Sequence, residues 1–469
     1  MTDVSPKPPP DKTLRWLIGI VIAVVVLVGG YVFYRWAVRR GVEKRYAAIH
    51  AAGQPVTLKE LDEWYPTPPV GLNGADVYQQ AFFKYSNTTM DRENLPIVGR
   101  ARLPELGEPI APEMLAAIRE YLAANAEALE LLHEASRYEQ CRYPINTSGG
   151  LGTLLPHLAQ CRQAARLLYL QTILKSEDGD AEGAAQAVMD SLAVGRSLNN
   201  EPILISRLVQ IACNYITYGS FERVLSRTEL TDGQLLELSE AFGNAKTPES
   251  IARALAGERC MGIGVFELED PSVRSGGGGQ GIPPLTVLKV TGLLDMDAKE
   301  YVDIMNGCIA ASQAPPGNLG EYAAEFDKRI PKLPRWCFFS RMLLPALSAA
   351  LNKDIRDAAQ LRCAATAAAV ERYRLAHGDL PSQLADVAPE FIPEIPADPF
   401  TGTPLLYKLA EDSCVVYSVG QDGKDDGGVE FESDADGQRS GEQLDLPFRL
   451  LRRTMEPHPA EISVPETEH

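Results

Sequence analysis

Close spacings of cysteine and histidine, which metal and redox sites require, are missing from this sequence of 469 residues. The eight cysteines include no C-x-x-C pair, which excludes a zinc ribbon and a dense disulfide framework. The six histidines include no H-E-x-x-H or other close metal-ligand spacing. We therefore predict buried free thiols, with one or two disulfides as the alternative in an oxidising compartment.

Local catalytic motifs are also absent. No G-x-S-x-G nucleophile elbow occurs. The run Gly276–Gly279 is not a phosphate loop, because it is not followed by Gly-Lys and Ser or Thr opening a helix. A catalytic group assembled from distant residues cannot be read from spacing alone, so the sequence names no reaction.

Acidic residues outnumber basic ones, with 63 Asp and Glu against 45 Lys and Arg, and the sequence shows no basic surface. The formal net charge is -18 at pH 7. Nucleic-acid binding needs a basic surface to neutralise phosphates, so we expect no nucleic-acid partner.

Only the N-terminus carries a long uncharged apolar run. From Trp16 to Tyr34 the chain has 19 residues without a charge, close to the roughly 20 that cross a bilayer as a helix. Aromatic rings stand at both ends, as is typical of membrane interfaces. The sequence predicts a transmembrane helix over residues 14–36. A cleaved secretory signal is the alternative, but no small-x-small cleavage site follows the run.

The side of the membrane that the body occupies is ambiguous from charge. The positive-inside rule counts Lys and Arg near the span. Five such residues follow the span and three precede it, which mildly favours a cytoplasmic body. We expect the later cluster to contact lipid headgroups. The residues are Lys7, Lys12 and Arg15 before the span, and Arg35, Arg39, Arg40, Lys44 and Arg45 after it.

The remaining chain reads as mainly α-helical. Apolar residues recur at steps of three and four from about Pro112 to Gly243, which predicts a helical bundle. A solenoid of helical repeats is the minority interpretation, since no second copy appears at a fixed period. The predicted segments are a disordered tail (1–13), the transmembrane helix (14–36), a juxtamembrane segment (37–111), a helical bundle (112–270), a Gly/Pro-rich linker (271–285), a helical continuation (286–349), a small α+β domain (350–447) and a disordered tail (454–469).

The C-terminal segment begins with the clearest predicted helix, residues 355–377. Gly378 and Pro381 supply the expected stop signal. Two strand-like runs follow, Leu405–Lys408 and Cys414–Val419.

This order of elements, with the motifs Y-R-L-A-H-G-D-L-P, I-P-A-D-P-F-T-G-T-P-L-L-Y and V-Y-S-V-G-Q-D-G, resembles the C-terminal part of the major pseudopilin of type II secretion systems. The resemblance covers about residues 350–447. It implies a helix packed on a small antiparallel sheet and a calcium-binding loop near the chain end.

The N-terminal part departs from that family. The span lies some 300 residues upstream and lacks the prepilin peptidase motif, so we expect no processing or filament assembly. The whole chain looks like a membrane-anchored bacterial protein carrying a pseudopilin-like end. The stretch A-A-G-Q-P-V-T-L-K-E-L-D-E-W-Y-P at residues 51–66 is similar to a pattern of that group.

An acidic, glycine-rich loop is the best candidate metal site. Calcium takes six to eight oxygen ligands, and glycines let carbonyls turn inward. The resemblance implies Asp422, Asp434 and Asp436 as ligands, with Asp425 or Asp426 as extras. The alternative is a solvated acidic loop that binds no metal.

Two main functions of different classes remain, with a purely structural spacer as a third possibility. The first is a non-enzymatic, membrane-anchored binding or scaffold protein of the bacterial envelope, whose partners are the lipid bilayer and another envelope protein. The second is a membrane-anchored enzyme, of hydrolase type for instance, with its site in the helical body between about residues 112 and 310. The pseudopilin-like end favours a body outside the cytoplasmic membrane, where calcium is plentiful, against the charge count.

Overall fold

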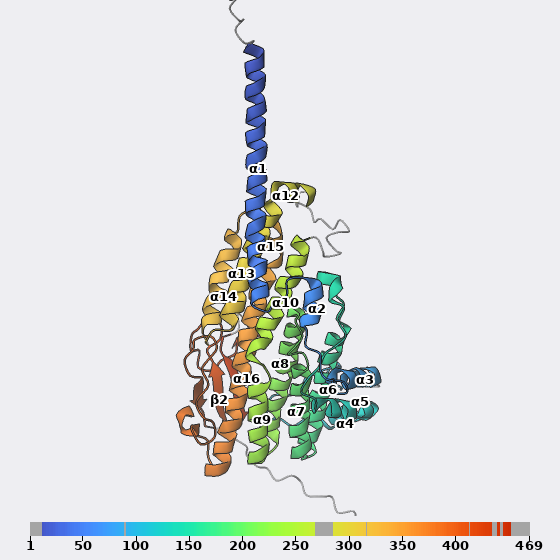
Figure 1. The fold of residues 1–469 in the computed structure, drawn as a ribbon. Helices are drawn as coiled ribbons and strands as arrows, with labels where there is room; N and C mark the ends of the chain where they lie inside the picture. Colours follow the sequence, from blue (N-terminus) through green and yellow to red (C-terminus); the bar gives the residue numbers. More distant parts are fainter. Residues whose placement is uncertain are drawn as a thin grey trace, which may run out of the picture.

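The structure is a computed structural model that describes residues 12–88, 91–267, 285–315, 317–411, 413–433, 439–440 and 444–451. One long helix projects from a mainly helical body, and a small sheet lies near the C-terminus (Figure 1). The helices are α1 (Lys12–Ala51), α2 (Leu58–Trp64), α3 (Gly74–Lys84), α4 (Pro112–Ala124), α5 (Ala126–Ser136), α6 (Pro156–Glu177), α7 (Ala181–Arg196), α8 (Leu204–Arg227), α9 (Asp232–Asn244), α10 (Pro248–Phe266), α12 (Leu285–Thr291), α13 (Leu293–Ser312), α14 (Asn318–Arg329), α15 (Phe338–Leu343) and α16 (Pro345–His377). Short 3-10 turns are η1 (Thr147–Gly152), η2 (Ile330–Lys332) and η3 (Leu384–Val387).

Helix α1 has two halves with different surroundings. Its apolar first half stands free of the body, and the large apolar side chains from Leu17 to Val28 are between 51% and 71% exposed. This part is long and apolar enough to cross a membrane. The second half packs on α13, where Val42 and Ile49 are buried.

The chain after α1 follows the local signals in the sequence. Gly53 takes a positive φ of 68° just beyond the helix end. Thr57 then caps α2, and its hydroxyl accepts from the Glu60 N–H while the Glu60 carboxylate accepts from the Thr57 N–H. The T-x-x-E spacing of Thr57 and Glu60 predicts this capping box and the start of a short helix, and the structure confirms both.

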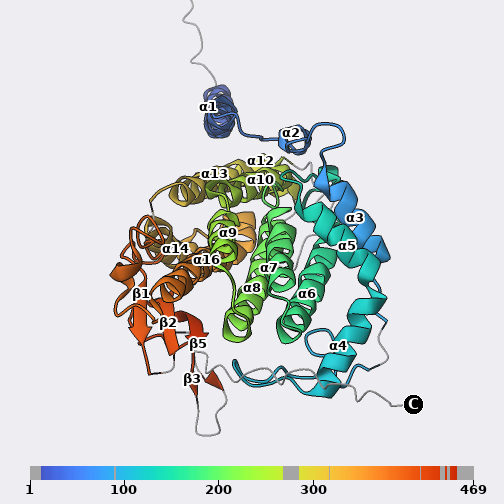
Figure 2. The same cartoon turned by 90° about the horizontal axis from the view of Figure 1, so that it is seen from below.

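The body is a set of packed helices, as the apolar periodicity predicts. Helix α6 packs on α7 and α8, and α16 packs on α8, α9 and α14. Seen from below, α10 and α13 form a layer between α1 and the other helices (Figure 2).

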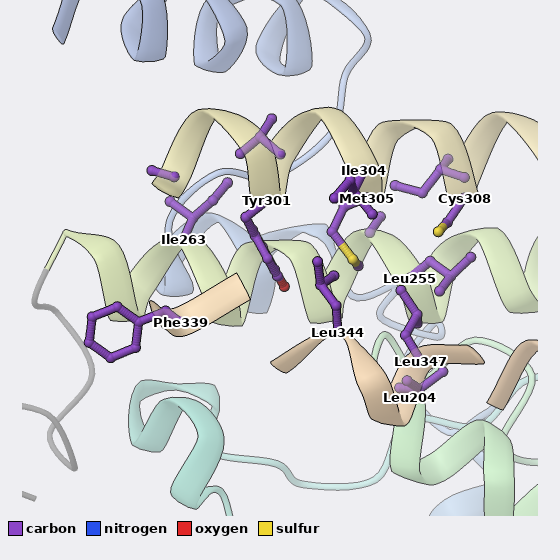
Figure 3. Packing of buried hydrophobic residues seen from close by; sticks show 14 of the residues in the cluster. Leu204, Leu255, Ile263, Tyr301, Ile304, Met305, Cys308, Phe339, Leu344 and Leu347 are labelled. Atoms are coloured by element: carbon purple, nitrogen blue, oxygen red, sulfur yellow. The ribbon is translucent and has the colours of Figure 1, made fainter. Parts of the chain in front are cut away.

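Close packing between α10 and α13 depends on Gly262 of α10, which has no side chain. A Cβ on Gly262 would lie 2.2 Å from the Tyr301 hydroxyl oxygen. That hydroxyl reaches across from α13 and donates to the Glu258 carbonyl at 3.0 Å (Figure 3). Met305, Leu344 and Leu347 fill the same core.

Helix α16 has 33 residues and begins ten residues before the predicted start, because Pro345 opens a helix without needing its missing N–H. It ends at Gly378, whose φ is 83°, as predicted. The apolar stripe in fact continues upstream through Leu351 and Leu347, both buried, so the predicted start at Ile355 was too late.

The C-terminal sheet is antiparallel with the order β1-β2-β5, and a second pair joins β3 to β4. The bounds are β1 (Leu406–Leu409), β2 (Ser413–Ser418), β3 (Glu432–Ser433), β4 (Arg439–Ser440) and β5 (Leu446–Leu451). Strand β5 was not predicted, and it extends the sheet past residue 447. Phe448 of β5 packs against Phe221 of α8, so the sheet and the helical body share one core.

All eight cysteines are free and buried, as predicted. Most of the predicted linker 271–285 and of the two terminal tails lies outside the described residues.

Candidate binding groove and acidic loop

A groove with a volume of about 1140 Å³ lies where α9, α16 and the proline-rich segment 389–399 meet. The end of α13 and the start of α14 close it at one side. Its apolar lining includes Leu236, Phe242, Ile251, Leu319, Ile355 and Phe391. The volume is slightly above the usual range of ligand-binding clefts, about 300–1000 Å³, and leaves room for a peptide segment.

Prolines make the outer wall of this groove. The segment 389–399 carries Pro389, Pro393, Pro396 and Pro399, which cannot donate to a helix or strand ladder. Arg372 of α16 holds the segment by donating to the Phe391 carbonyl at 3.0 Å. The groove is therefore bounded by a proline-rich segment of turns and bends set against two helices.

A buried network of charges lies under the groove floor. Arg207 of α8 donates to Asp354 at 2.7 Å and to Asp357 at 2.6 Å, both on α16. Lys246, which lines the groove, bonds the other Asp354 oxygen. Two cations thus face two carboxylates, all with side chains at most 16% exposed. The sequence reasoning missed this network.

The pKa values in the network show how the charges compete. Burial opposes ionisation of Asp354, but Lys246 and Arg207 outweigh it and hold the pKa of that carboxyl below its usual value. Burial lowers the pKa of Lys246, and the attraction of Asp354 does not offset it because Arg207 repels the ammonium. Lys246 is therefore the one perturbed amine that we find lining the described groove.

Arg362 is the cation of the groove wall that lacks an acidic partner. Its guanidinium donates to the Ala397 carbonyl, and within the described residues it forms no ion pair. Burial lowers its pKa, against a weaker opposing effect of Asp398. A half-buried guanidinium with spare donors can bind a carboxylate.

A second buried polar cluster joins α6 to α8. His157 lies 3.0 Å from a Glu201 oxygen, and the Ser206 hydroxyl donates to the same carboxylate. A nucleophilic triad needs the histidine between the serine and the acid. Here the carboxylate lies between them, and no histidine contacts Ser206 within the described residues, so the cluster lacks the order of a triad and we interpret it as structural.

The acidic loop places only some of the predicted ligands together. Asp422 accepts from the Lys424 N–H at 3.1 Å and pairs with its ammonium at 3.5 Å. Asp425 accepts from the Tyr417 hydroxyl at 2.9 Å. Asp434 and Asp436 lie outside the described residues.

Asp445 is the loop residue that the sequence reasoning missed. It is fully buried, and its Oδ2 accepts from the N–H groups of Asp426 and Gly428 at 3.1 and 2.7 Å. Its Oδ1 and the Asp426 Oδ2 are buried and find no partner among the described residues. The sequence does contain a signal for Asp445. Asp445 and Arg449 are the charged residues of the otherwise apolar stretch from Leu444 to Leu451, and a charge buried in such a stretch needs a partner.

Asp426 and Asp445 are the residues of the described loop that could contribute oxygen ligands to a hard cation. Burial, and then the charges of Asp426 and Asp425, raise the pKa of Asp445, which a bound cation would reverse. In the described ranges no three His, Cys, Asp or Glu side chains converge as a complete metal site. Two further predicted ligands fall outside those ranges.

Comparison of the chain with protein-family models, with curated proteins and with solved structures found no match.

Proposed function

We propose that this chain is a membrane-anchored, non-enzymatic binding or scaffold protein of the bacterial envelope. The groove between α9, α16 and segment 389–399 carries the proposal. Its occupant is an extended segment of another envelope protein, with apolar side chains along the floor and a carboxylate for Arg362.

The anchor is α1, retained in the mature chain. Its first half is exposed and apolar, while its second half is part of the body's core. Cleavage after the apolar run would leave the docked half in place but free the body from the bilayer. The proposed anchoring therefore requires that α1 is not cleaved.

The C-terminal part is proposed to be pseudopilin-like. The helix α16 against a small antiparallel sheet is what that resemblance implies. We propose a structural calcium ion held by Asp426 and Asp445, with Asp425, Asp434 and Asp436 as further ligands and Asp422 at the loop entrance. A calcium site favours a body on the outer side of the cytoplasmic membrane.

An enzyme with its site in the helical body is the second candidate, and Lys246 is the observation in its favour. A lysine with a lowered pKa at a groove can act as a nucleophile. However, its ammonium is hydrogen-bonded to Asp354, and no histidine or cysteine lines the described groove. The binding role therefore stands first.

The groove is tested by filling it. Ala358 of α16 lines the groove and is half-buried, so Ala358→Trp fills it without entering the core. Ala349, on the same helix, is exposed and outside the groove, so Ala349→Trp is the matched control. The probe is a random peptide library displayed on phage, selected against the full chain in lipid nanodiscs.

The proposal expects selected peptides to be rich in apolar residues with a carboxylate. Their binding should fall at least about tenfold in Ala358→Trp, roughly 1.4 kcal/mol, and stay unchanged in Ala349→Trp. Peptides that bind both variants equally would show that the groove is not a docking site.

A further inference from the structure

Helix α12 lies beside α1 at the level where the apolar run of α1 ends. The Tyr31 hydroxyl donates to the Val290 carbonyl of α12. The first turn of α13, which follows α12, also contacts α1, since the Tyr34 hydroxyl lies 3.2 Å from the Met296 sulfur. Arg35 pairs with Asp295 at 2.9 Å. In Figure 1 the axis of α12 runs across the axis of α1, at the end of the body from which α1 projects.

A tight turn fixes this placement. Gly292, between α12 and α13, has a φ of 81° that L side chains rarely adopt. A Cβ there would lie 2.5 Å from an Arg35 nitrogen and 3.3 Å from the Tyr34 ring. The turn is therefore pressed against α1 and sets the direction of α12.

The two faces of α12 differ in the way expected of a helix at a water–lipid boundary. Leu288 is 1% exposed and points into the body. At about 100° per residue, Val290 lies about 160° around the helix from Leu288, on the opposite face. Val290 is 62% exposed and Val287 47%, and they lie about 60° apart on this face, while Lys289 is exposed at the side of the helix, about 100° from Val290.

The height of α12 along α1 decides what covers this face. The run from Trp16 to Tyr34 spans about 28 Å as a helix, close to the roughly 30 Å of a hydrocarbon core. Tyr31 is three residues before the end of that run. An element bonded to Tyr31 must then lie at the boundary between hydrocarbon and headgroups.

We propose that α12 is a second membrane contact, which lies flat in the interface of the bilayer that holds α1. Val287 and Val290 enter the edge of the acyl region, and Lys289 reaches the phosphates of anionic lipids. The body thus rests on the membrane surface with a fixed tilt instead of swinging on α1. This inference rests on the proposed role of α1 as a membrane anchor.

The test places a fluorescent probe on α12. All eight native cysteines are buried, so an added surface thiol is labelled selectively with an environment-sensitive NBD group. The variants are Val290→Cys on α12, Val24→Cys in the apolar run and Leu409→Cys on the exposed part of β1. Each full-length protein is reconstituted in vesicles of equal parts phosphatidylcholine and phosphatidylglycerol, with and without spin-labelled quencher lipids.

At Val290→Cys we expect blue-shifted emission and strong quenching by a lipid labelled near the headgroup. Val24→Cys should be quenched best by a lipid labelled deep in the acyl chain, and Leu409→Cys by neither. If Val24→Cys is quenched while Val290→Cys behaves like Leu409→Cys, the contact of α12 is refuted and the anchor stands. If Val24→Cys is not quenched, both the anchor and the contact fail.

Discussion

Asp354 of α16 is the residue on which the buried charge network depends, because both Arg207 and Lys246 bond its carboxylate. Asp354→Asn keeps the shape but leaves two cations with one remaining carboxylate, Asp357. Breaking a buried pair in this way costs about 3–5 kcal/mol. We expect that loss in the free energy of unfolding, measured by urea titration of the full chain in detergent.

An exposed ion pair supplies the control for this prediction. Asp178 accepts two hydrogen bonds from Arg119, and both side chains are more than 40% exposed. Asp178→Asn should cost at most about 1 kcal/mol. Equal losses in the two variants would contradict the assignment of Asp354 as the buried partner.

The acidic loop predicts a response to calcium. Within the described residues, Asp426 and Asp445 each keep a buried oxygen without a partner, and the proposed calcium ion would bind these oxygens. The melting temperature of the full chain should rise by several degrees with calcium chloride over excess chelator, because binding to the folded state stabilises it. Asp426→Asn combined with Asp445→Asn should abolish the rise, whereas Asp178→Asn should keep it. A rise that survives the double substitution would place the ion elsewhere.

For single residues, the sequence indicated which residue types matter but not which distant residues they contact. The loop from Asp422 to Gly428 was recognised by its carboxylates and glycines. Asp445 was not, since its role appears only when β5 returns beside the loop. Arg207 and Asp354 are 147 residues apart, and no local pattern pairs them.

Among the elements, helices with local signals were predicted well. The capping residue Thr57 and the stop at Gly378 each rest on contacts within a few residues. Strand β5 was missed because it contains Pro447, which is unusual within a strand, and because its partner β2 lies about 30 residues earlier.

Helix α8 and strand β5 meet at a titrating carboxyl. Glu222 of α8 accepts from the Arg449 N–H at 2.7 Å, and burial raises its pKa from 4.5 to about 7. The folded state therefore holds a proton that the unfolded state releases. The free energy of unfolding must fall as pH rises from about 4.5 through 7, by up to about 1.4 kcal/mol per pH unit.

Glu222→Gln removes this titration and keeps an acceptor for Arg449. The stability of the variant relative to the native chain should increase between about pH 5 and 7 and level off above pH 8. Glu258, whose pKa burial raises to about 7, and Asp297, raised to about 6, titrate in both proteins and cancel in the difference. A constant difference across this range would mean that Glu222 is not the titrating group.

The whole molecule is one body joined to one projecting helix. The C-terminal sheet shares its core with α8 and α9, which the linear division into segments did not anticipate. The basic cluster after the apolar run also has a structural role, because Arg35, Arg39 and Arg45 pair with carboxylates of the body. These pairs, with the apolar contacts of Val42 and Ile49, fix α1 to the body.

Retention of α1 in a bilayer is the claim on which the anchor, the orientation of the body and the contact of α12 all depend. The most direct measurement is the intact mass of the chain after membranes from expressing cells are washed with alkaline carbonate. The account predicts a chain of the full 469 residues, apart from any loss of the first methionine, in the pellet. A chain shortened by about 35 residues and released into the supernatant would contradict it, because α1 would then be a cleaved signal.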